Sequence, residues 1–516
     1  MNSGSILWID DEVNSLKSHI VFLEEKGFNI NTVTNGYDAI DLVKNNQYDI
    51  IFLDENMPGL SGLDTLSQLK EFTHSPVIMI TKNEQEQIME EAIGSKISDY
   101  LIKPVNPHQI LLTIKKNLEF SKLINNKTNA DYQREFLSIG SMINDVNSFD
   151  DWVNIYKKIV YWELELDSLE ENNMLEILLN QKKEANLNFF KYIKKNYKEL
   201  IHQTSDNNVT FSNSIFEKYV LPRISNDQST FLLVIDNLRF DQWRVIQPLL
   251  DPYFSIKEDT YCSILPTATQ YCRNAIFSGM MPSEMKNKLP EFWLDDVDEG
   301  GKNLYEKDFL IQQLKQYNCS QNISFNKVFN LDHGKKMLER INEFLSKSLN
   351  VIIYNFVDIL SHAKTDVKMI KELANDEKSY RDLTLTWFKN SPLFELLKQL
   401  SSSNVKIIIT SDHGTMNVTE PSKVIGEKNI SSNLRYKTGR KIKFDNRDVF
   451  YIDDPEKIFL PKTNLSSSYI FAGPNKYFVY PNNYNHYAHH YINTYQHGGI
   501  SMEEMILPII SLKSKL

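Results

Sequence analysis

The sequence predicts an α/β protein in three parts: a doubly wound α/β domain at residues 1–120, a helical middle domain at 121–215 and a second α/β domain at 216–516. Three observations support this division. Short apolar segments alternate with amphipathic helical patterns in both outer parts, as is typical of parallel sheets covered by helices. The middle part contains no proline and almost no glycine, and its apolar residues recur at helical spacing. The length of 516 residues suits three or four domains.

The composition is that of an ordinary globular chain, with 41% hydrophobic and 24% charged residues. The formal net charge of −10 argues against bulk coating of nucleic acid, although it allows a local basic groove. The first residues run directly into a strand without a signal-peptide pattern, and apolar runs such as Phe231–Ile235 are too short to span a bilayer. The three cysteines have neither paired nor zinc-finger spacing, so we expect a cytoplasmic location.

Five apolar segments in the first 120 residues are predicted to form a parallel sheet. They are Ser5–Ile9, Asn29–Val33, Asp49–Leu53, Val77–Ile80 and Asp99–Ile102. The carboxyl ends of parallel strands gather at one edge, so the polar residues that end these strands should lie together. They are Asp10, Asp11, Asp54, Thr81 and Lys103. Carboxylates are the ligands that Mg²⁺ prefers, and a lysine can neutralise a phosphoryl group on an aspartate.

This ordered set resembles a response-regulator receiver domain and implies a flavodoxin-like fold. Met57-Pro58-Gly59 and Ser61-Gly62 match the loop that follows the phosphorylation site in that family. The resemblance implies that Asp54 accepts the phosphoryl group and that Mg²⁺ is held by Asp10, Asp11, Asp54 and the backbone carbonyl of Asn56. It also implies that Thr81 and Tyr100 are switch residues and that Lys103 binds the phosphoryl group.

The middle part, residues 121–215, is predicted to be a small helical bundle that joins two α/β units. Apolar residues recur at helical spacing, first at Trp152, Ile155, Ile159 and Trp162, and then at Leu175, Ile177 and Leu178. No residue pattern here suggests catalysis. The bundle is interpreted either as a mechanical element, for relay or dimerisation, or as a plain packed spacer.

In the carboxyl-terminal part, three predicted strands end at potential metal ligands. Thr230–Ile235 ends at Asp236, Asn350–Val357 at Asp358, and Val405–Thr410 at Asp412-His413. His362 follows Asp358 by four residues, which places both side chains on one helix face if the helix begins at Asp358. With His497, these aspartates and histidines suit zinc and suffice for two metals.

The segment Ser263–Gly279 is predicted to form a turn and a helix beside these ligands. Pro266 blocks regular structure, Thr267 or Thr269 can cap the helix, and Gly279 can end it. Backbone N–H groups at a helix N-terminus favour an anion such as phosphate. Two metals about 4 Å apart that share the Thr269 hydroxyl would lower its pKa and clamp a transferring phosphoryl group. Each feature alone also fits an ordinary cap, loop or turn.

The order of these motifs resembles the alkaline phosphatase superfamily, specifically its PglZ-type branch. The stretch from Pro266-Thr-Ala-Thr to Ser278-Gly279 is also similar to the nucleophile segment of nucleotide pyrophosphatase/phosphodiesterases, in which the second threonine attacks. The resemblance therefore implies an alkaline-phosphatase-like α/β domain with Thr269, not Thr267, as nucleophile. It assigns one Zn²⁺ to Asp358, His362 and His497, and the other to Asp236, Asp412, His413 and Thr269.

Two parts of this assignment stay open at the sequence level. His486, His489 and His490 compete with His497, although the Gly-Gly after His497 and the following Glu-Glu-Met favour His497. A sulfatase is excluded because Cys272 lacks the Cys-x-Pro-x-Arg context of that family. A basic loop with Arg435, Lys437, Arg440 and Lys441 could grip a nucleotide chain, but it fits a solvated surface loop nearly as well.

A receiver, a helical middle and a PglZ-type domain in this order resemble the PorX-type response regulators tied to bacterial type IX secretion. This implies phosphorylation of Asp54 by a PorY-type sensor histidine kinase, a zinc-dependent phosphodiesterase that acts on linear or cyclic oligonucleotides, and dimerisation on phosphorylation. It also implies an extracytoplasmic-function sigma factor as partner. The alternative is a non-enzymatic scaffold whose zinc domain binds a sigma factor or secretion component.

Overall fold

The computed structural model describes residues 4–73, 75–82, 97–118, 120–169, 173–202, 209–225, 227–296, 298–319, 322–426, 431–445, 449–462, 464 and 466–515. The chain divides into two compact units, residues 1–131 and 132–516. The predicted boundary at residue 215 therefore does not separate two compact bodies. Residues 132–215 of the helical middle and the second α/β domain form one compact unit.

The first unit is a doubly wound α/β domain, as predicted. Its five-stranded parallel sheet has the order β2-β1-β3-β4-β5. The strands are β1 (Gly4–Ile9), β2 (Phe28–Val33), β3 (Ile50–Asp54), β4 (Val77–Thr81) and β5 (Asp99–Ile102). The helices are α1 (Lys17–Glu25), α2 (Gly36–Asn45), α3 (Gly62–Leu69) and α5 (Pro107–Leu118). Residues 83–96, between β4 and β5, lie outside the described residues.

Each face of this sheet has its own apolar core, because alternate residues of a strand point to opposite faces. Leu7 and Ile9 of β1 belong to a core with α2 and α3. Ile6 and Trp8 belong to the opposite core, which includes α1 and α5 residues. The inner strands β1, β3 and β4 are therefore apolar over most of their length, whereas the edge strand β2 also carries polar residues.

Three long helices form the middle of the chain. They are α6 (Phe120–Asn144), α7 (Phe149–Asp167) and α8 (Asn173–Ile201). Ser148 caps α7 in a capping box with Asp151, which explains where that helix begins. On α7, Trp152, Ile155 and Ile159 are buried as their spacing predicts, whereas Ile177 on α8 is exposed.

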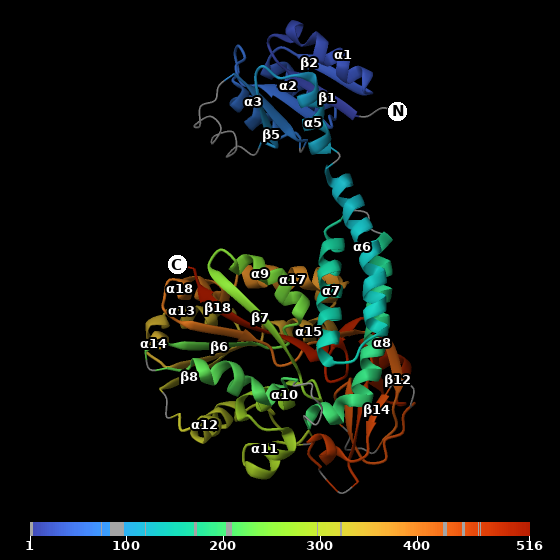
Figure 1. Cartoon of the computed structure of the whole chain (residues 1–516), viewed down its shortest axis with the longest axis vertical. Coiled ribbons are helices and arrows are strands. Elements are labelled where there is room, and N and C mark those ends of the chain that lie inside the picture. Colours follow the sequence, from blue (N-terminus) through green and yellow to red (C-terminus); the bar gives the residue numbers. More distant parts are fainter. Residues whose placement is uncertain are drawn as a thin grey trace. The chain divides into compact units, whose positions relative to one another are not determined.

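The second unit is built on a six-stranded sheet with the order β7-β18-β10-β6-β9-β8. Its strands are β6 (Thr230–Ile235), β7 (Phe254–Cys262), β8 (Ile323–Val328), β9 (Leu349–Tyr354), β10 (Lys406–Thr410) and β18 (Ile506–Ser514). Strands β8, β9, β6 and β10 are parallel, and β18 runs antiparallel to its neighbours. Figure 1 shows α9 and α17 on one side of this sheet and α10 and α12 on the other.

The helices of this unit are α9 (Phe240–Leu250), α10 (Thr269–Ser278), α11 (Pro282–Lys288), α12 (Glu306–Gln316), α13 (Leu331–Leu338), α14 (Ile341–Leu345), α15 (Phe356–Asp366), α16 (Lys368–Leu373), α17 (Glu377–Lys389), α18 (Pro392–Ser401), α19 (Tyr484–Tyr491) and α20 (Met502–Met505). Small sheets between residues 416 and 496 are formed by β11 (Met416–Val418), β12 (Glu420–Lys423), β13 (Tyr436–Gly439), β14 (Val449–Ile452), β15 (Ser468–Ala472), β16 (Lys476–Val479) and β17 (Thr494–Gln496).

The helical middle shares one continuous apolar core with the large sheet. A buried charge network joins the same parts. Arg381 of α17 lies 2.7 Å from Glu163 of α7 and 3.1 Å from Asp241 of α9, and it also pairs with Asp167. Burial alone would raise the pKa of Glu163, but Lys182 and Arg381 lower it to about 2. Helices α7 and α8 are therefore integral parts of the second unit.

We expect Arg381→Met to destabilise this unit by about 3–5 kcal/mol, because Glu163 and Asp241 would stay buried without their shared cation. Urea unfolding followed by tryptophan fluorescence measures the change. The control is Arg340→Met, since Arg340 is half-exposed and pairs only locally with Glu343. Equal unfolding midpoints for the two variants would contradict a structural role for the network.

Candidate metal centres

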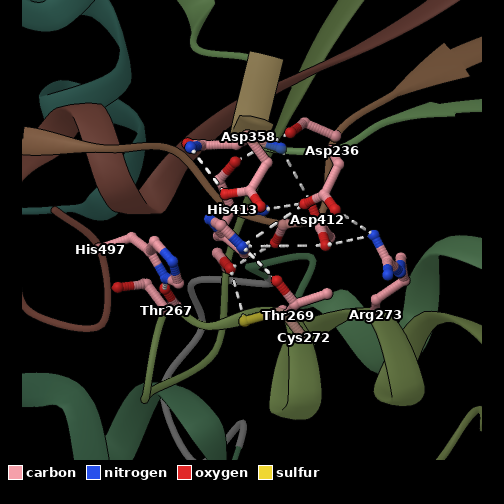
Figure 2. Close-up of polar contacts among 12 residues, drawn as sticks. Asp236, Thr267, Thr269, Cys272, Arg273, Asp358, Asp412, His413 and His497 are labelled. Carbon is pink, nitrogen blue, oxygen red and sulfur yellow. Dashed lines mark hydrogen bonds and ion pairs between the residues drawn. The ribbon is translucent and has the colours of Figure 1, made fainter. Parts of the chain in front are cut away.

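The carboxyl ends of three neighbouring strands bring the predicted acids together. Asp236 directly follows β6, and Asp412 lies two residues after β10. Asp358 stands in the first turn of α15, which begins at Phe356, two residues earlier than predicted. Because β6 pairs with both β9 and β10, the three carboxylates converge at one edge of the sheet (Figure 2).

Asn237, the residue after Asp236, ties these three strand ends to one another. Its φ of 67° lies in the left-handed region, which asparagine tolerates better than most residues. In this conformation its backbone N–H donates to Asp412 Oδ1 at 3.2 Å, and its side-chain amide donates to Asp358 Oδ1 at 3.3 Å. The turn thus fixes one oxygen of each partner carboxylate and leaves the others for different contacts.

The first predicted ligand set, Asp358, His362 and His497, presents ligand atoms that all lie within 4.8 Å of one another. Both Asp358 and His362 come from α15, and His362 Nε2 is 3.5 Å from Asp358 Oδ2. The Nδ1 atom of His497 lies 3.2 Å from the carbonyl of Thr267, which fixes the orientation of the ring. This contact leaves Nε2 of His497 as the ligand atom.

The second predicted set, Asp236, Asp412 and His413, is fully buried and meets the same distance limit. The Nδ1 atom of His413 lies 3.2 Å from the carbonyl of Gly414, so Nε2 faces the acids. From Nε2 the distances are 3.7 Å to Asp236 Oδ1 and 3.9 Å to Asp412 Oδ2. The rings of His413 and His497 stack with centroids 4.2 Å apart, which places the two sets side by side.

Thr269 points into the second set rather than capping its helix. Helix α10 begins at Thr269 after Ala268, and no side chain caps it, so the prediction of a threonine cap was wrong. The Thr269 hydroxyl instead lies 2.9 Å from His413 Nε2. The hydroxyl of Thr267 donates to the carbonyl of Gly499 and accepts from the N–H of Gly498. Thr267 therefore fastens the turn that carries His497.

Crowding of acids and imidazoles dominates the electrostatics of this site. Burial, and then the nearby Asp236, raise the pKa of Asp358 to about 6 and that of Asp412 well above its usual range. Burial also lowers the pKa of His413, and burial with the neighbouring His413 and His362 lowers that of His497 well below its usual range. The site thus favours neutral imidazoles and needs added positive charge to keep its carboxylates ionised.

The donor atoms fit divalent metal ions. Asp236 Oδ1 and Asp412 Oδ2 are buried without a hydrogen-bond partner among the described residues, although the Arg273 guanidinium lies 3.5 Å from Asp412 Oδ2. Orphaned buried carboxylate oxygens are costly unless a cation completes them. Neutral imidazole nitrogens with carboxylate oxygens are the ligands that zinc commonly takes.

Arg273 is a residue of this site that the sequence analysis missed. It follows Thr269 by one helical turn of α10 and is almost fully buried. Its guanidinium contacts Asp236 Oδ2 at 2.6 Å, Glu306 Oε1 at 2.6 Å and Asp412 Oδ2 at 3.5 Å. The four-residue spacing from Thr269 was visible in the sequence, but the carboxylates it meets come from distant strands. Arg273 supplies one fixed positive charge beside Asp236 and Asp412 of the second ligand set (Figure 2).

A cleft of about 490 Å³ opens above the Thr269 hydroxyl. Its described lining includes Asp358, His362 and His497, together with the polar residues Gln270, Asp296, Lys302, Asn303 and Asn433. Asn303 also donates to the carbonyl of Thr269 at 3.1 Å, which holds the start of α10. Lys302, whose Nζ donates to the carbonyl of Asp298, is a cation in the lining of this cleft, and no sequence pattern had indicated it.

The predicted basic loop must be corrected in part. Arg435 is fully buried: it pairs with Glu504 at 2.6 Å and donates to the carbonyl of Gly473 at 2.5 Å. Lys437 is buried as well and donates to the carbonyl of Ser431. Both are structural, because their polar atoms are used inside the fold. Arg440 and Lys441 are exposed, but neither belongs to the described lining of the cleft.

The competing histidines lie elsewhere. His486, His489 and His490 are exposed on α19, where His486 stacks on His490 with centroids 6.3 Å apart. None of them joins a ligand cluster in the described part of the chain. Geometry thus favours His497 among the four.

In the first unit, the strand-end residues also come together. Ligand atoms of Asp10, Asp11 and Asp54 lie within 4.8 Å of one another. Lys103 Nζ is 2.8 Å from Asp10 Oδ2 and 3.0 Å from Asp54 Oδ1. Burial raises the pKa of Asp54, although Lys103 opposes this shift. The arrangement offers oxygen ligands for Mg²⁺ beside one carboxylate and one cation.

The predicted switch residues Thr81 and Tyr100 contact other parts of the first unit. The Thr81 hydroxyl donates to the carboxylate of Glu55, next to Asp54. Tyr100 of β5 packs against the core that includes α2 and α3. Asn56 lies in the loop after β3, two residues beyond Asp54. The predicted receiver residues are thus at the carboxyl edge of the sheet or in the elements that flank it.

Comparisons with known protein families match three successive parts of the chain. Residues 6–115 match the response regulator receiver domain, residues 122–201 the PorX response regulator linker domain, and residues 215–512 the BREX system PglZ alkaline phosphatase-like domain. The three families follow one another in the predicted order, and the predicted fold class is confirmed.

Individual relatives match the first unit. The "Transcriptional regulatory protein SrrA" of Staphylococcus aureus is 33% identical over 113 residues, which cover 22% of this chain and 47% of that protein. This chain thus spans about half the length of that relative. A two-component response regulator from Clostridium difficile is 31% identical over 22% of this chain and 95% of its own, with a TM-score of 0.22. A CheY-like receiver from Methanospirillum hungatei is 23% identical over 22% and 93%, also with a TM-score of 0.22. No helix in the described ranges is long and apolar enough to cross a membrane.

We expect Arg273→Met to weaken metal binding about 10–100-fold, because Asp236 and Asp412 would lose the contacts that orient them. Metal content after dialysis and competition with a chelator measure the loss. Arg244→Met is the control, since Arg244 is partly exposed on α9 and pairs with Glu258 away from the ligands. Wild-type metal affinity in Arg273→Met would refute its role at the site.

Proposed function

Because this chain belongs to the family of PglZ alkaline phosphatase-like domains and carries the architecture of a PorX-like response regulator, we propose that it is a phosphorylation-controlled phosphodiesterase that binds two zinc ions. The observation that carries the proposal is the Thr269 hydroxyl, 2.9 Å from His413 Nε2, where two Asp/His ligand sets face one polar cleft. A scaffold would need metal ligands, but it would not need this hydroxyl.

When bound, two zinc ions supply Lewis-acid stabilisation of the phosphoryl oxygens. Asp358, His362 and His497 would hold one ion, and Asp236, Asp412 and His413 the other. The Thr269 hydroxyl gives its proton to solvent while its oxygen forms the new bond to phosphorus, and the bond from phosphorus to the departing alkoxide breaks. The departing alkoxide takes a proton from solvent. Water then forms a bond to the phosphorus of the phosphothreonine, the bond from phosphorus to the Thr269 oxygen breaks, and a proton from that water restores the hydroxyl.

The chain's own groups bind and orient the substrate. The N-terminus of α10 directs backbone N–H groups toward the cleft, a position that favours a phosphoryl anion. Lys302 adds a cation at the rim, and Asn303 holds the backbone of Thr269. Room for a phosphodiester with polar groups on either side supports an oligonucleotide substrate, linear or cyclic.

The same proposal extends to control and partners. A sensor histidine kinase, of the PorY type, would phosphorylate Asp54 in the Mg²⁺ site of Asp10 and Asp11. We further propose a cytoplasmic protein with a role in type IX secretion, and an extracytoplasmic-function sigma factor or a secretion component as its partner. The support is the family architecture and the three free cysteines.

The direct test is Thr269→Val, which keeps the shape of the side chain and removes the nucleophile. We expect kcat on bis-p-nitrophenyl phosphate and on short oligonucleotides to fall by about 10³-fold or more, with zinc content retained. Thr386→Val is the matched control, because Thr386 is exposed on α17 in the same unit. Turnover retained in Thr269→Val would remove the nucleophile assignment, and bound zinc without turnover in the wild type would favour the scaffold.

A second test concerns the switch. A phosphoryl group adds about −1.5 to −2 charge at Asp54, which should draw Thr81 inward and reorder Tyr100 on β5. We therefore expect beryllofluoride, a phosphoryl mimic, to double the mass measured by light scattering. Asp54→Ala should abolish the increase, whereas Asp41→Ala, an exposed acid on α2, should retain it. An equal response in Asp54→Ala would contradict control through this site.

A further inference from the structure

Helix α20 (Met502–Met505) is fully buried although it carries two adjacent acids, Glu503 and Glu504. Buried carboxylates are retained only when polar partners complete them. Since neighbouring residues of a helix point about 100° apart, the side chains of Glu503 and Glu504 contact different neighbours. Their partners show what this short helix holds in place.

Glu504 fixes the turn that carries the metal ligand His497. Its Oε1 accepts from the N–H of Gly499 at 2.9 Å, and its Oε2 accepts from the hydroxyl of Ser501 at 2.9 Å. Arg435 pairs with the same carboxylate at 2.6 Å. A side chain at Gly499 would collide with Arg435 at 2.7 Å, so the turn lies directly on this ion pair.

The backbone of α20 also supports the second ligand set. The carbonyl of Glu504 accepts from the N–H of Gly414, next to His413. A Cβ at Gly414 would stand 2.0 Å from the carbonyl oxygen of Glu503, which shows how closely the two segments pack. The carbonyl of Met505 accepts from Ser263, whose hydroxyl in turn donates to the carbonyl of Asp412. One short helix thus underlies both metal-ligand turns.

The other side of α20 is held by α8 of the helical middle, the part of the chain that matches the linker domain. The side-chain oxygen of Asn186 accepts from the N–H of Met502 at 2.8 Å, and its amide donates to both oxygens of Glu503 at 3.0 and 3.2 Å. Lys182, one turn earlier on α8, lies 3.3 Å from Glu503. All three side chains are buried. The contacts therefore run from α8 through α20 to His413 and His497.

We propose that Asn186 is a positioning residue for the metal centre: linker helix α8 sets the place of α20 and, through it, the two turns that carry His413 and His497. The linker is then a working part of the catalytic centre, and a displacement of α8 changes metal affinity. This inference rests on the proposed metal site but not on catalysis at that site.

The test exchanges the amide of Asn186 and the carboxylate of Glu503 between the two positions. Asn186→Asp keeps the acceptor for Met502 but places a carboxylate against Glu503, so chelator competition should show zinc affinity reduced about 10–100-fold. Adding Glu503→Gln restores one donor and one carboxylate to the pair and should return affinity to within about threefold of wild type. The control is Asn188→Asp on the same helix, where the side chain contacts only Lys191 among the described residues and zinc affinity should not change.

Thermal unfolding of the chelator-treated proteins shows whether a change in zinc affinity comes from displaced ligand turns or from a less stable fold. We expect the double variant Asn186→Asp/Glu503→Gln, in which the buried pair again has one donor and one carboxylate, to unfold in its apo form close to the wild-type melting temperature. Wild-type zinc affinity in Asn186→Asp, or a loss that the second substitution does not rescue, would overturn the proposal. Absence of zinc from the wild-type protein would instead sink the proposed function, so the two failures are distinguishable.

Discussion

The second unit depends on one electrostatic constraint, the convergence of Asp236, Asp358 and Asp412 at the carboxyl edge of a buried sheet. Burial raises the pKa values of Asp358 and Asp412, and repulsion from the neighbouring carboxylates raises them further. Arg273 provides one fixed positive charge, and metal ions would provide the rest. Thr269 and Arg273 both belong to α10, so the proposed nucleophile and the cation that balances the acids share one helix.

The crowding of carboxylates also bears on the polar groups around the ligand histidines. Two of the ligand histidines use their second nitrogen on a backbone carbonyl, His413 on Gly414 and His497 on Thr267. These contacts fix the orientation of both rings before any metal binds, and outer-shell contacts of this kind preserve ligand geometry. The buried pair Arg435–Glu504 has the same purpose one layer further out, which is why its arginine is not available to substrate.

Much of the site could be predicted because strand ends in parallel sheets converge, so acids at such ends are informative even without coordinates. That rule placed Asp236, Asp358 and Asp412 as well as Asp10 and Asp54. It could not place Arg273, Lys302 or Asn237, because their roles depend on contacts between segments 28 to 175 residues apart. It also could not show that Arg435 is buried. The threonine cap failed for a related reason: a tertiary partner, His413, competed with the local one.

The shared core of linker and sheet bears on how phosphorylation could act. A flexible connection would pass little of a displacement on to the metal site. Helix α7, in contrast, is fixed to the helices that cover the large sheet by buried ion pairs such as Arg381–Glu163. A ligand or modification shifts an equilibrium only by its differential free energy in the two states. A shift of about 1.4 kcal/mol at α8 would change metal affinity tenfold. Because Asn186 and Glu503 connect α8 to both ligand turns, small linker displacements would be sufficient, and no large movement of the metal ligands is required.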